Sequence, residues 1–149
     1  MSDFIGVARK EGISTGTALR TVLQLLAPAN HRLRLLEAGI SFHGIVNTNE
    51  PITVDLIRQT TAGSGGTGLT PVKLDDSLSE TLQTTALHTI TTEPTAGDVL
   101  MTWAVHPQTG LIYQVPQGQE IKIGGGDRLG LRVLAGASVN CDAYLKFEE

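Results

Sequence analysis

Cysteine is almost absent from this sequence, since Cys141 is the only one among 149 residues. A single cysteine cannot form a disulfide within the chain, and its place in an apolar row near the C-terminus predicts a small buried residue instead of a reactive thiol. Aromatic residues make up 4% and charged residues 17% of the chain, whereas about a quarter of an average domain is charged. Few charges and 17 glycines are typical of turn-rich β structure and of surfaces that partners partly cover.

Blocks of positive charge are also missing. The chain has 11 basic and 15 acidic residues and a formal charge of -4, and neither sign forms a block of five or more residues. Nucleic-acid binding depends largely on neutralising phosphates, so a binder of this size would carry a basic stripe. Arg32 and Arg34 are the densest basic stretch, and they alternate with Leu33 and Leu35, which indicates the solvent face of a strand. We therefore expect no nucleic-acid partner.

Long apolar runs are the third absence. No stretch approaches eighteen apolar residues, and the first residues lack the apolar segment of a signal peptide. We expect a soluble chain that begins at or near Met1 and has no membrane partner.

The clearest pattern present is at the C-terminus. Residues 139–148 alternate between apolar and polar side chains, with Cys141, Ala143, Leu145 and Phe147 on one side and Tyr144 and Lys146 on the other. A two-residue period is that of a strand with one buried face. A strand at the end of a chain must pair with strands already in place, which favours an antiparallel assembly.

Further strand patterns follow one another along the chain. Residues 17–27 fit a strand or a helix, and we favour a strand because the turn residues 28–31 lead directly into another extended run. That run, residues 32–43, changes phase near Glu37 to Gly39, which indicates a β-bulge. The other predicted strands are residues 52–59, a Thr-rich edge strand at 84–92, and residues 99–106, 111–115, 120–123 and 128–134, the last two joined as a hairpin by 124–127.

The segments between these strands are predicted to be loops. Residues 44–51 and 60–68 have loop composition, and 69–82 reads as a surface excursion or a single helical turn. Residues 1–18 read as an extended N-terminal arm, and residues 19–149 as a single β-sandwich domain. About eight strands without a long helix predict an all-β antiparallel sandwich, and the long connections favour a jelly roll over an immunoglobulin-type sandwich.

Two sequence patterns match catalytic or cofactor-binding motifs, but neither has the structural context that its motif requires. Gly63, Gly65 and Gly68 fit G-x-G-x-x-G, but the residues that follow do not predict the helix that a dinucleotide site requires. Ser14, between Gly12 and Gly16, fits G-x-S-x-G without a buried strand before it. The glycine-rich segment is therefore interpreted as a flexible loop and the segment around Ser14 as part of a mobile arm, and we expect no catalytic residues.

The four histidines also give no metal motif. Cupin-like jelly rolls place two histidines one residue apart on a strand, whereas His31, His43, His88 and His106 are each isolated. We expect neither a metal site nor a cofactor. An enzyme of cupin or isomerase type remains a minor alternative.

Four segments resemble small β-sandwich proteins from the structural gene regions of tailed bacteriophages, namely capsid decoration or cement proteins. These segments are residues 30–44, 58–63, 69–75 and 116–120. The resemblance implies a jelly-roll-like subunit, often a homotrimer, on the outer surface of the capsid at junctions between capsomers of the major capsid protein. It implies no catalytic residues.

We therefore expect a virion structural protein that stabilises the head by non-covalent contacts, with the major capsid protein and further copies of itself as partners. The residues predicted to make protein contacts are Phe4, Ile5, Val7, Arg9, Ile13, Tyr144 and Lys146. The alternatives are another virion role, in the tail or neck, and a carbohydrate-binding jelly roll that uses Trp103 or Tyr144 as an aromatic platform.

Overall fold

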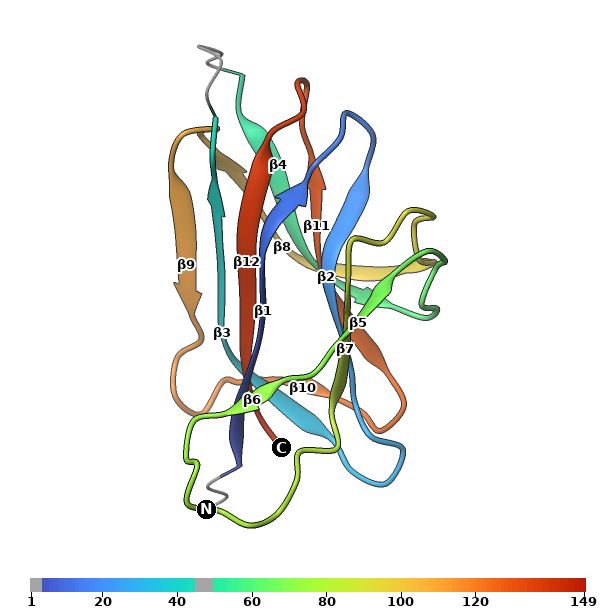
Figure 1. The fold of residues 1–149 in the computed structure, drawn as a ribbon, viewed down its shortest axis with the longest axis vertical. Helices are drawn as coiled ribbons and strands as arrows, with labels where there is room; N and C mark the ends of the chain where they lie inside the picture. The colour runs from blue at the N-terminus through green and yellow to red at the C-terminus, as the bar shows by residue number, and fades with distance from the viewer. Residues whose placement is uncertain (1–3, 45–49) are drawn as a thin grey trace.

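The computed structural model describes residues 4–44 and 50–149, and within them the chain forms two antiparallel β-sheets and no helix (Figure 1). The first sheet contains β1 (Ile5–Ser14), β3 (Leu33–Phe42), β6 (Val72–Lys73), β9 (Gly110–Gln114), β10 (Ile121–Ile123) and β12 (Asn140–Glu148). The second sheet contains β2 (Arg20–Leu26), β4 (Ile52–Gln59), β5 (Thr67–Leu69), β7 (Thr85–His88), β8 (Ala96–Val105) and β11 (Arg128–Leu134). The predicted all-β antiparallel sandwich is confirmed.

The order of the longer strands is that of a jelly roll. The first sheet runs β10-β3-β12-β1-β6, with β9 also paired to β3, and the second runs β5-β7-β2-β11-β4-β8. Four long strands of each sheet therefore lie in the orders β1-β12-β3-β9 and β2-β11-β4-β8, the interleaved pattern of two Greek keys. The sequence prediction included seven of these eight longer strands, all but β1, together with the short strands β7 and β10. It missed β1, β5 and β6.

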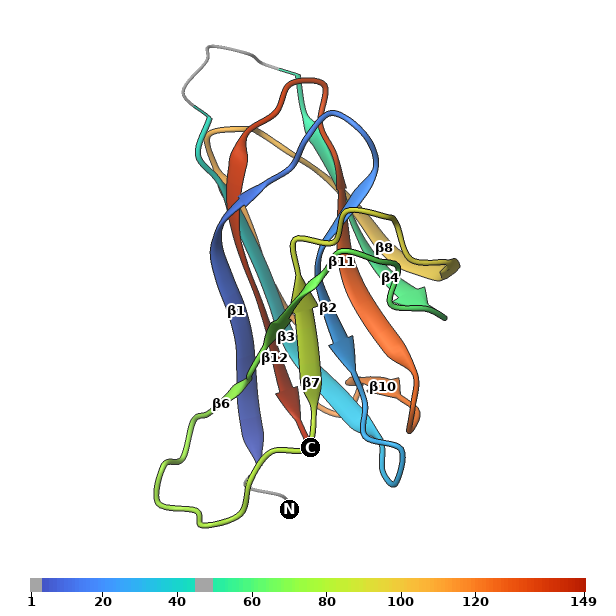
Figure 2. The ribbon, with the colours of Figure 1, turned by 45° about the vertical axis from the view of Figure 1, so that its right-hand side comes forward.

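Chain crossings close both open sides of the sandwich. On one side, β8 at the edge of the second sheet leads through a turn into β9 of the first sheet, with the Thr109 amide bonded to the His106 carbonyl at 3.0 Å. On the other side, β5 at the edge of the second sheet leads into β6 at the edge of the first (Figure 2). The segment 69–82, predicted to be a surface excursion, thus begins by connecting the two sheets.

The core lies between the inner faces of the two sheets. It follows from the alternation of each strand, which sends every second side chain inward. The largest side chains that are fully buried include Leu23, Leu25, Leu33, Leu35, Leu56, Leu129 and Phe147. Cys141 is also buried, as predicted, and burial raises the pKa of its thiol to about 12, so the group stays protonated at neutral pH.

The N-terminal segment is not an arm over residues 5–14, and this part of the prediction is wrong. These residues form β1, which pairs along its length with β12 and near its start with β6. The alternation of β1 is hidden in the sequence because its inward residues Gly6 and Ala8 are small. A bulge at Glu11 and Gly12, between the pairs of Lys10 and Ile13, also breaks the period. Residues 1–3 of the predicted arm lie outside the described residues.

Other boundaries differ in smaller ways. The Thr-rich strand β7 lies between β5 and β2 and is not an edge. The segments around 124–127 are joined by a turn, but β10 and β11 belong to different sheets and form no hairpin. The bulge predicted near Glu37 to Gly39 is present one residue earlier, because Lys146 pairs with Glu37 while Phe147 pairs with Leu35. Of the predicted loop 44–51, residues 45–49 lie outside the described residues.

Candidate interaction face and its hollow

Strand β12 supplies the centre of the candidate site, on the outer face of the first sheet. Its inward row, Cys141, Ala143, Leu145 and Phe147, is buried as the alternation predicted. The opposite row points away from the core and is half-buried or exposed, and it consists of Asn140, Asp142, Tyr144, Lys146 and Glu148. No other described strand layer lies over this row.

Pairing with β1 brings most of the predicted contact residues onto this same face. Residues directly opposite in an antiparallel pair point to the same side of the sheet. Val7 lies opposite Lys146, Arg9 opposite Tyr144, and Ile5 opposite Glu148.

Two of the predicted contact residues do not join this group. Ile13 is 1% exposed and packs in the core, because the bulge at Glu11 and Gly12 turns it inward. Its prediction as a surface contact is therefore wrong. Phe4 precedes β1 and is half-buried, and its carbonyl accepts a hydrogen bond from the Glu149 amide at 2.8 Å.

Strand β6 adds two apolar residues that the sequence interpretation missed. Val72 lies opposite Val7 and is 66% exposed. The Leu74 amide binds the Ile5 carbonyl at 2.9 Å, and the Leu74 side chain is 58% exposed. We call Ile5, Val7, Val72 and Leu74 the apolar edge. The alternation of Val72, Lys73 and Leu74 was a weak sign of this strand, masked by the neighbouring Pro71.

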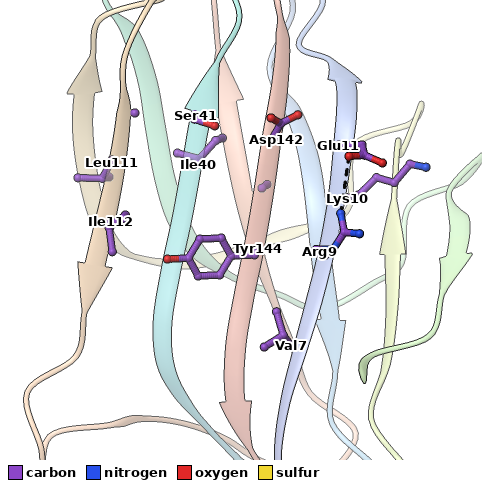
Figure 3. A pocket seen from close by; sticks show the side chains of 12 residues that line it. Val7, Arg9, Lys10, Glu11, Ile40, Ser41, Leu111, Ile112, Asp142 and Tyr144 are labelled. Atoms are coloured by element: carbon purple, nitrogen blue, oxygen red, sulfur yellow. Dashed lines mark ion pairs between the residues drawn. The ribbon is translucent and has the colours of Figure 1, made fainter. Parts of the chain in front are cut away.

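A hollow of about 590 Å³ lies beside the apolar edge, over β1, β12, β3 and β9 (Figure 3). It arises because the outward positions of β3 and β9 carry little side-chain volume. Gly39 lies between Ile112 and Tyr144 in one cross-strand row, and Ser41 lies between Gly110 and Asp142 in the next. Two glycines and a serine thus leave the sheet surface low, while Ile112, 67% exposed, stands at the β9 side.

The Tyr144 ring extends from β12 across β3 and is seen face-on in Figure 3. Only a glycine at position 39 permits this, because a Cβ there would lie 2.1 Å from Tyr144 Cε1. The Tyr144 hydroxyl donates to Glu37 Oε2 at 2.7 Å, and Gln114 Nε2 donates to Glu37 Oε1 at 2.8 Å. The ring is therefore held at both its face and its hydroxyl.

The electrostatics of this contact agree with its geometry. Burial, supported by the hydrogen bond to Glu37, raises the pKa of Tyr144 to about 12. The hydrogen bonds from Tyr144 and then Gln114 hold the pKa of Glu37 below its usual value, since they favour its charged form. Lys146 Nζ lies 3.7 Å from Glu37 Oε2 and balances the remaining charge.

Asp142 fixes the other end of the hollow. The Gly12 amide donates to Asp142 Oδ1 at 3.0 Å, and His43 Nε2 lies 2.6 Å from Asp142 Oδ2. The bond from Gly12, with a smaller effect of His43, lowers the pKa of Asp142. Asp142 is therefore charged at neutral pH, and it joins β12 to the bulge of β1.

The remaining candidates lie away from this face. Trp103 is half-buried, with its ring centroid 5.4 Å from that of Tyr113, so it is not an open platform. Within the described ranges, no group of three or more His, Cys, Asp or Glu side chains is placed to hold a metal ion. The glycine-rich segment at 60–68 continues into β5 and not into a helix. Ser14 ends β1, with its hydroxyl 3.1 Å from that of Ser138.

Helices that could cross a membrane are not found in the described part of the chain. No protein-family model, curated protein or solved structure matches the chain.

Proposed function

We propose that this chain is a virion structural protein of a tailed bacteriophage, a decoration or cement protein that binds the outside of the capsid. It is made in the host cytoplasm and lies on the outer surface of the capsid. It stabilises the shell by non-covalent contacts that bridge neighbouring capsomers of the major capsid protein. Its resemblance to decoration proteins supports this role, and so does its jelly-roll topology.

The observation that carries the proposal is the apolar edge. Single exposed apolar residues are ordinary, whereas neighbouring ones on a flat sheet surface are typical of protein contacts. Val72 and Leu74 are both more than half exposed, and they adjoin Ile5 and Val7 on the next strand. Covering this surface by a partner would remove its apolar area from water.

The contact is made by the sheet and not by a detached arm. Because β1 lies between β12 and β6, deletion of residues 2–16 would remove a strand from the interior of the sheet and would not test binding. Substitutions on the outward side chains of the apolar edge leave the strand pairing intact, so they are the appropriate test.

Repetition compensates for the modest size of the edge. A capsid presents many equivalent sites, and linked contacts gain affinity through their high effective concentration. We propose that the sides of the sandwich form a homotrimer, which brings three apolar edges to one capsomer junction. Light scattering of the purified protein measures this directly, and a stable monomer at the concentrations used for binding would remove the trimer from the proposal.

The decisive experiment measures binding of V72D/L74D to empty heads of the encoding phage prepared without this chain. We expect at least a tenfold loss of bound protein, because two buried carboxylates would oppose the contact. The matched control is V99D, which alters a residue 46% exposed on β8 of the second sheet. Equal binding by the wild type and V72D/L74D would contradict the proposed use of the edge.

A tail or neck position in the virion is the second candidate location, since the same surface can bind either type of shell protein. Cryo-electron microscopy of the particle distinguishes the two. Density for the sandwich on the head lattice supports decoration, and density at the tail or neck alone would replace it.

A further inference from the structure

The hollow around Tyr144 adjoins the apolar edge, because Val7 belongs to the edge and also lines the hollow. The two differ in what they add: the edge continues as aliphatic side chains, whereas the hollow combines apolar residues such as Ile112 with an aromatic ring and charged and polar groups. Its volume of about 590 Å³ is in the range of small-molecule sites.

The Tyr144 ring is held in a fixed position by contacts within the protein, so it is preorganised for stacking with a ligand. One side of Tyr144 lies against Gly39, and its hydroxyl is bonded to Glu37. Glu37 is in turn held by Gln114 and lies near Lys146. A platform fixed in this way loses little conformational freedom on binding, which is the main benefit of preorganisation. The electron-rich face of an aromatic ring attracts weakly positive C–H groups.

The charges around the hollow select against ionic ligands. Four charged residues line it, two positive and two negative, and these are Arg9, Lys10, Glu11 and Asp142. The opposite signs lie close together, since Arg9 Nη1 is 3.7 Å from Glu11 Oε2. Neither an anion nor a cation would find a net complementary charge here, so a neutral ligand fits best.

The polar groups of the rim match hydroxyls in particular. Ser41 is exposed and can both donate and accept. Asp142 offers acceptor positions beyond the bonds from Gly12 and His43, and Arg9 offers donors. A ligand that stacks an apolar C–H face while its edge donates and accepts hydrogen bonds uses all of these features, and a pyranose ring has this shape.

We propose that the hollow is a binding site for neutral saccharides, in which a pyranose ring stacks on Tyr144 and its hydroxyls bind Asp142, Ser41 and Arg9. Of the two aromatic platforms suggested by the sequence, this excludes Trp103, whose ring packs against Tyr113. The site does not depend on the proposed role in the capsid.

The first experiment measures whether the wild-type protein binds sugars. The probes are maltotriose, cellotriose, laminaritriose, lactose and N,N′-diacetylchitobiose. Binding of each sugar, at millimolar concentration, is detected by saturation-transfer NMR. An array of immobilised neutral glycans, run in parallel, distinguishes free oligosaccharides from surface polysaccharides as the source of the ligand. We expect saturable binding of at least one probe. Absence of saturable binding in both formats would overturn the proposal.

Two variants then locate the site. Y144A removes the platform, and we expect at least a tenfold loss of affinity for the probe that binds. S41W fills the hollow from an exposed position and leaves Tyr144 in place, so we expect a similar loss without unfolding. Unchanged sugar binding by both variants would show that the saccharide site does not lie in this hollow.

Matched controls separate the site from general effects on folding. Y113F alters the other tyrosine, which does not line the hollow, so this variant should bind within about threefold of the wild type. V72D/L74D should retain sugar binding while losing the heads, which keeps the saccharide site and the proposed function independently testable. Circular dichroism confirms that each variant is folded.

Discussion

The two outer faces of the sandwich are built in opposite ways. On the second sheet, outward polar residues are buried: Thr21, Gln24 and Gln59 are each 3% exposed or less. Segments 60–66 and 89–95 lie over them and supply hydrogen-bond partners, including Glu93 and the Thr61 carbonyl. Within residues 4–44 and 50–149, no such segment lies over Tyr144 or the apolar edge of the first sheet. The outer face of the second sheet is thus covered by other segments of the chain, whereas the outer face of the first sheet is open at Tyr144 and the apolar edge.

On the covered outer face of the second sheet, which we call the closed face, the buried polar side chains are linked by a continuous chain of hydrogen bonds. Gln24 Nε2 donates to Gln59 Oε1 at 2.7 Å, and Gln59 Nε2 donates to Thr21 Oγ1 at 2.6 Å. Arg128 donates to Gln24 Oε1 at 3.1 Å, and the Thr21 amide donates to Glu93 Oε2 at 2.7 Å. Buried amides are tolerated only when paired in this way. The hydrogen bonds of this face therefore stabilise the fold, whereas the open face of the first sheet is accessible to a partner.

The largest expected effect is on the closed face. Q59A removes one buried hydrogen bond from Gln24 and one from Thr21 and creates a small cavity, so we expect a loss of about 2–4 kcal/mol in the free energy of unfolding. Denaturant titration measures it. The matched variant on the open face, Q114A, removes an exposed hydrogen bond to Glu37 and should cost under about 1 kcal/mol. Equal losses would contradict the distinction between the faces.

The next effect concerns the ring on the open face. G39A places a Cβ against Tyr144 and forces the ring away from Glu37, which should cost about 1–3 kcal/mol. The clash disappears when Tyr144 is truncated, so G39A should cost little in a Y144A background. A double-mutant cycle by denaturant unfolding measures this coupling. Additive losses would show that the ring does not depend on Gly39.

A smaller effect appears at acid pH. The folded-state pKa of Glu37 lies below the ordinary value of 4.5, so its carboxylate stabilises the fold above about that pH. This contribution is lost as the pH falls through the folded-state pKa. E37Q cannot titrate, so its unfolding free energy should fall less steeply below pH 4.5, by under about 1 kcal/mol in total. Parallel acid profiles for the two proteins would contradict the linkage.

The smallest effect is expected at the apolar edge. V72D/L74D should change the free energy of unfolding by no more than about 0.5 kcal/mol, because both side chains are mostly in water already. Thermal unfolding measures this. A loss as large as that of Q59A would mean that the edge belongs to the fold and not to a contact surface.

The predictability of each region from sequence follows from how regular it is. Strand β12 was found in full because its buried residues alternate without interruption. Strand β1 was interpreted as an arm because Gly6 and Ala8 are small and the bulge at Glu11 and Gly12 breaks the period. The same bulge made Ile13 a wrong contact residue. The short strand β6, and with it Val72 and Leu74, is held only by pairing across the chain.

The candidate site was predicted in part for the same reason. Tyr144 and Lys146 follow from the outward row of β12, and their alignment with Arg9 and Val7 follows only from the register of β1. The hollow could not be predicted, since it depends on Gly39 and Ser41 of β3 lying beside Gly110 of β9 and opposite Tyr144 and Asp142 of β12.

The sequence by itself determined the class of this protein: an all-β chain with an alternating C-terminal strand and Cys141 in the core. These properties depend on composition and on local periodicity, which a short window such as residues 139–148 displays. The tertiary structure decided which face is covered, where the apolar edge lies, and that Tyr144 rests on Gly39. Those properties depend on which strands become neighbours and in what register, because contacts between distant residues are set by packing and not by local pattern.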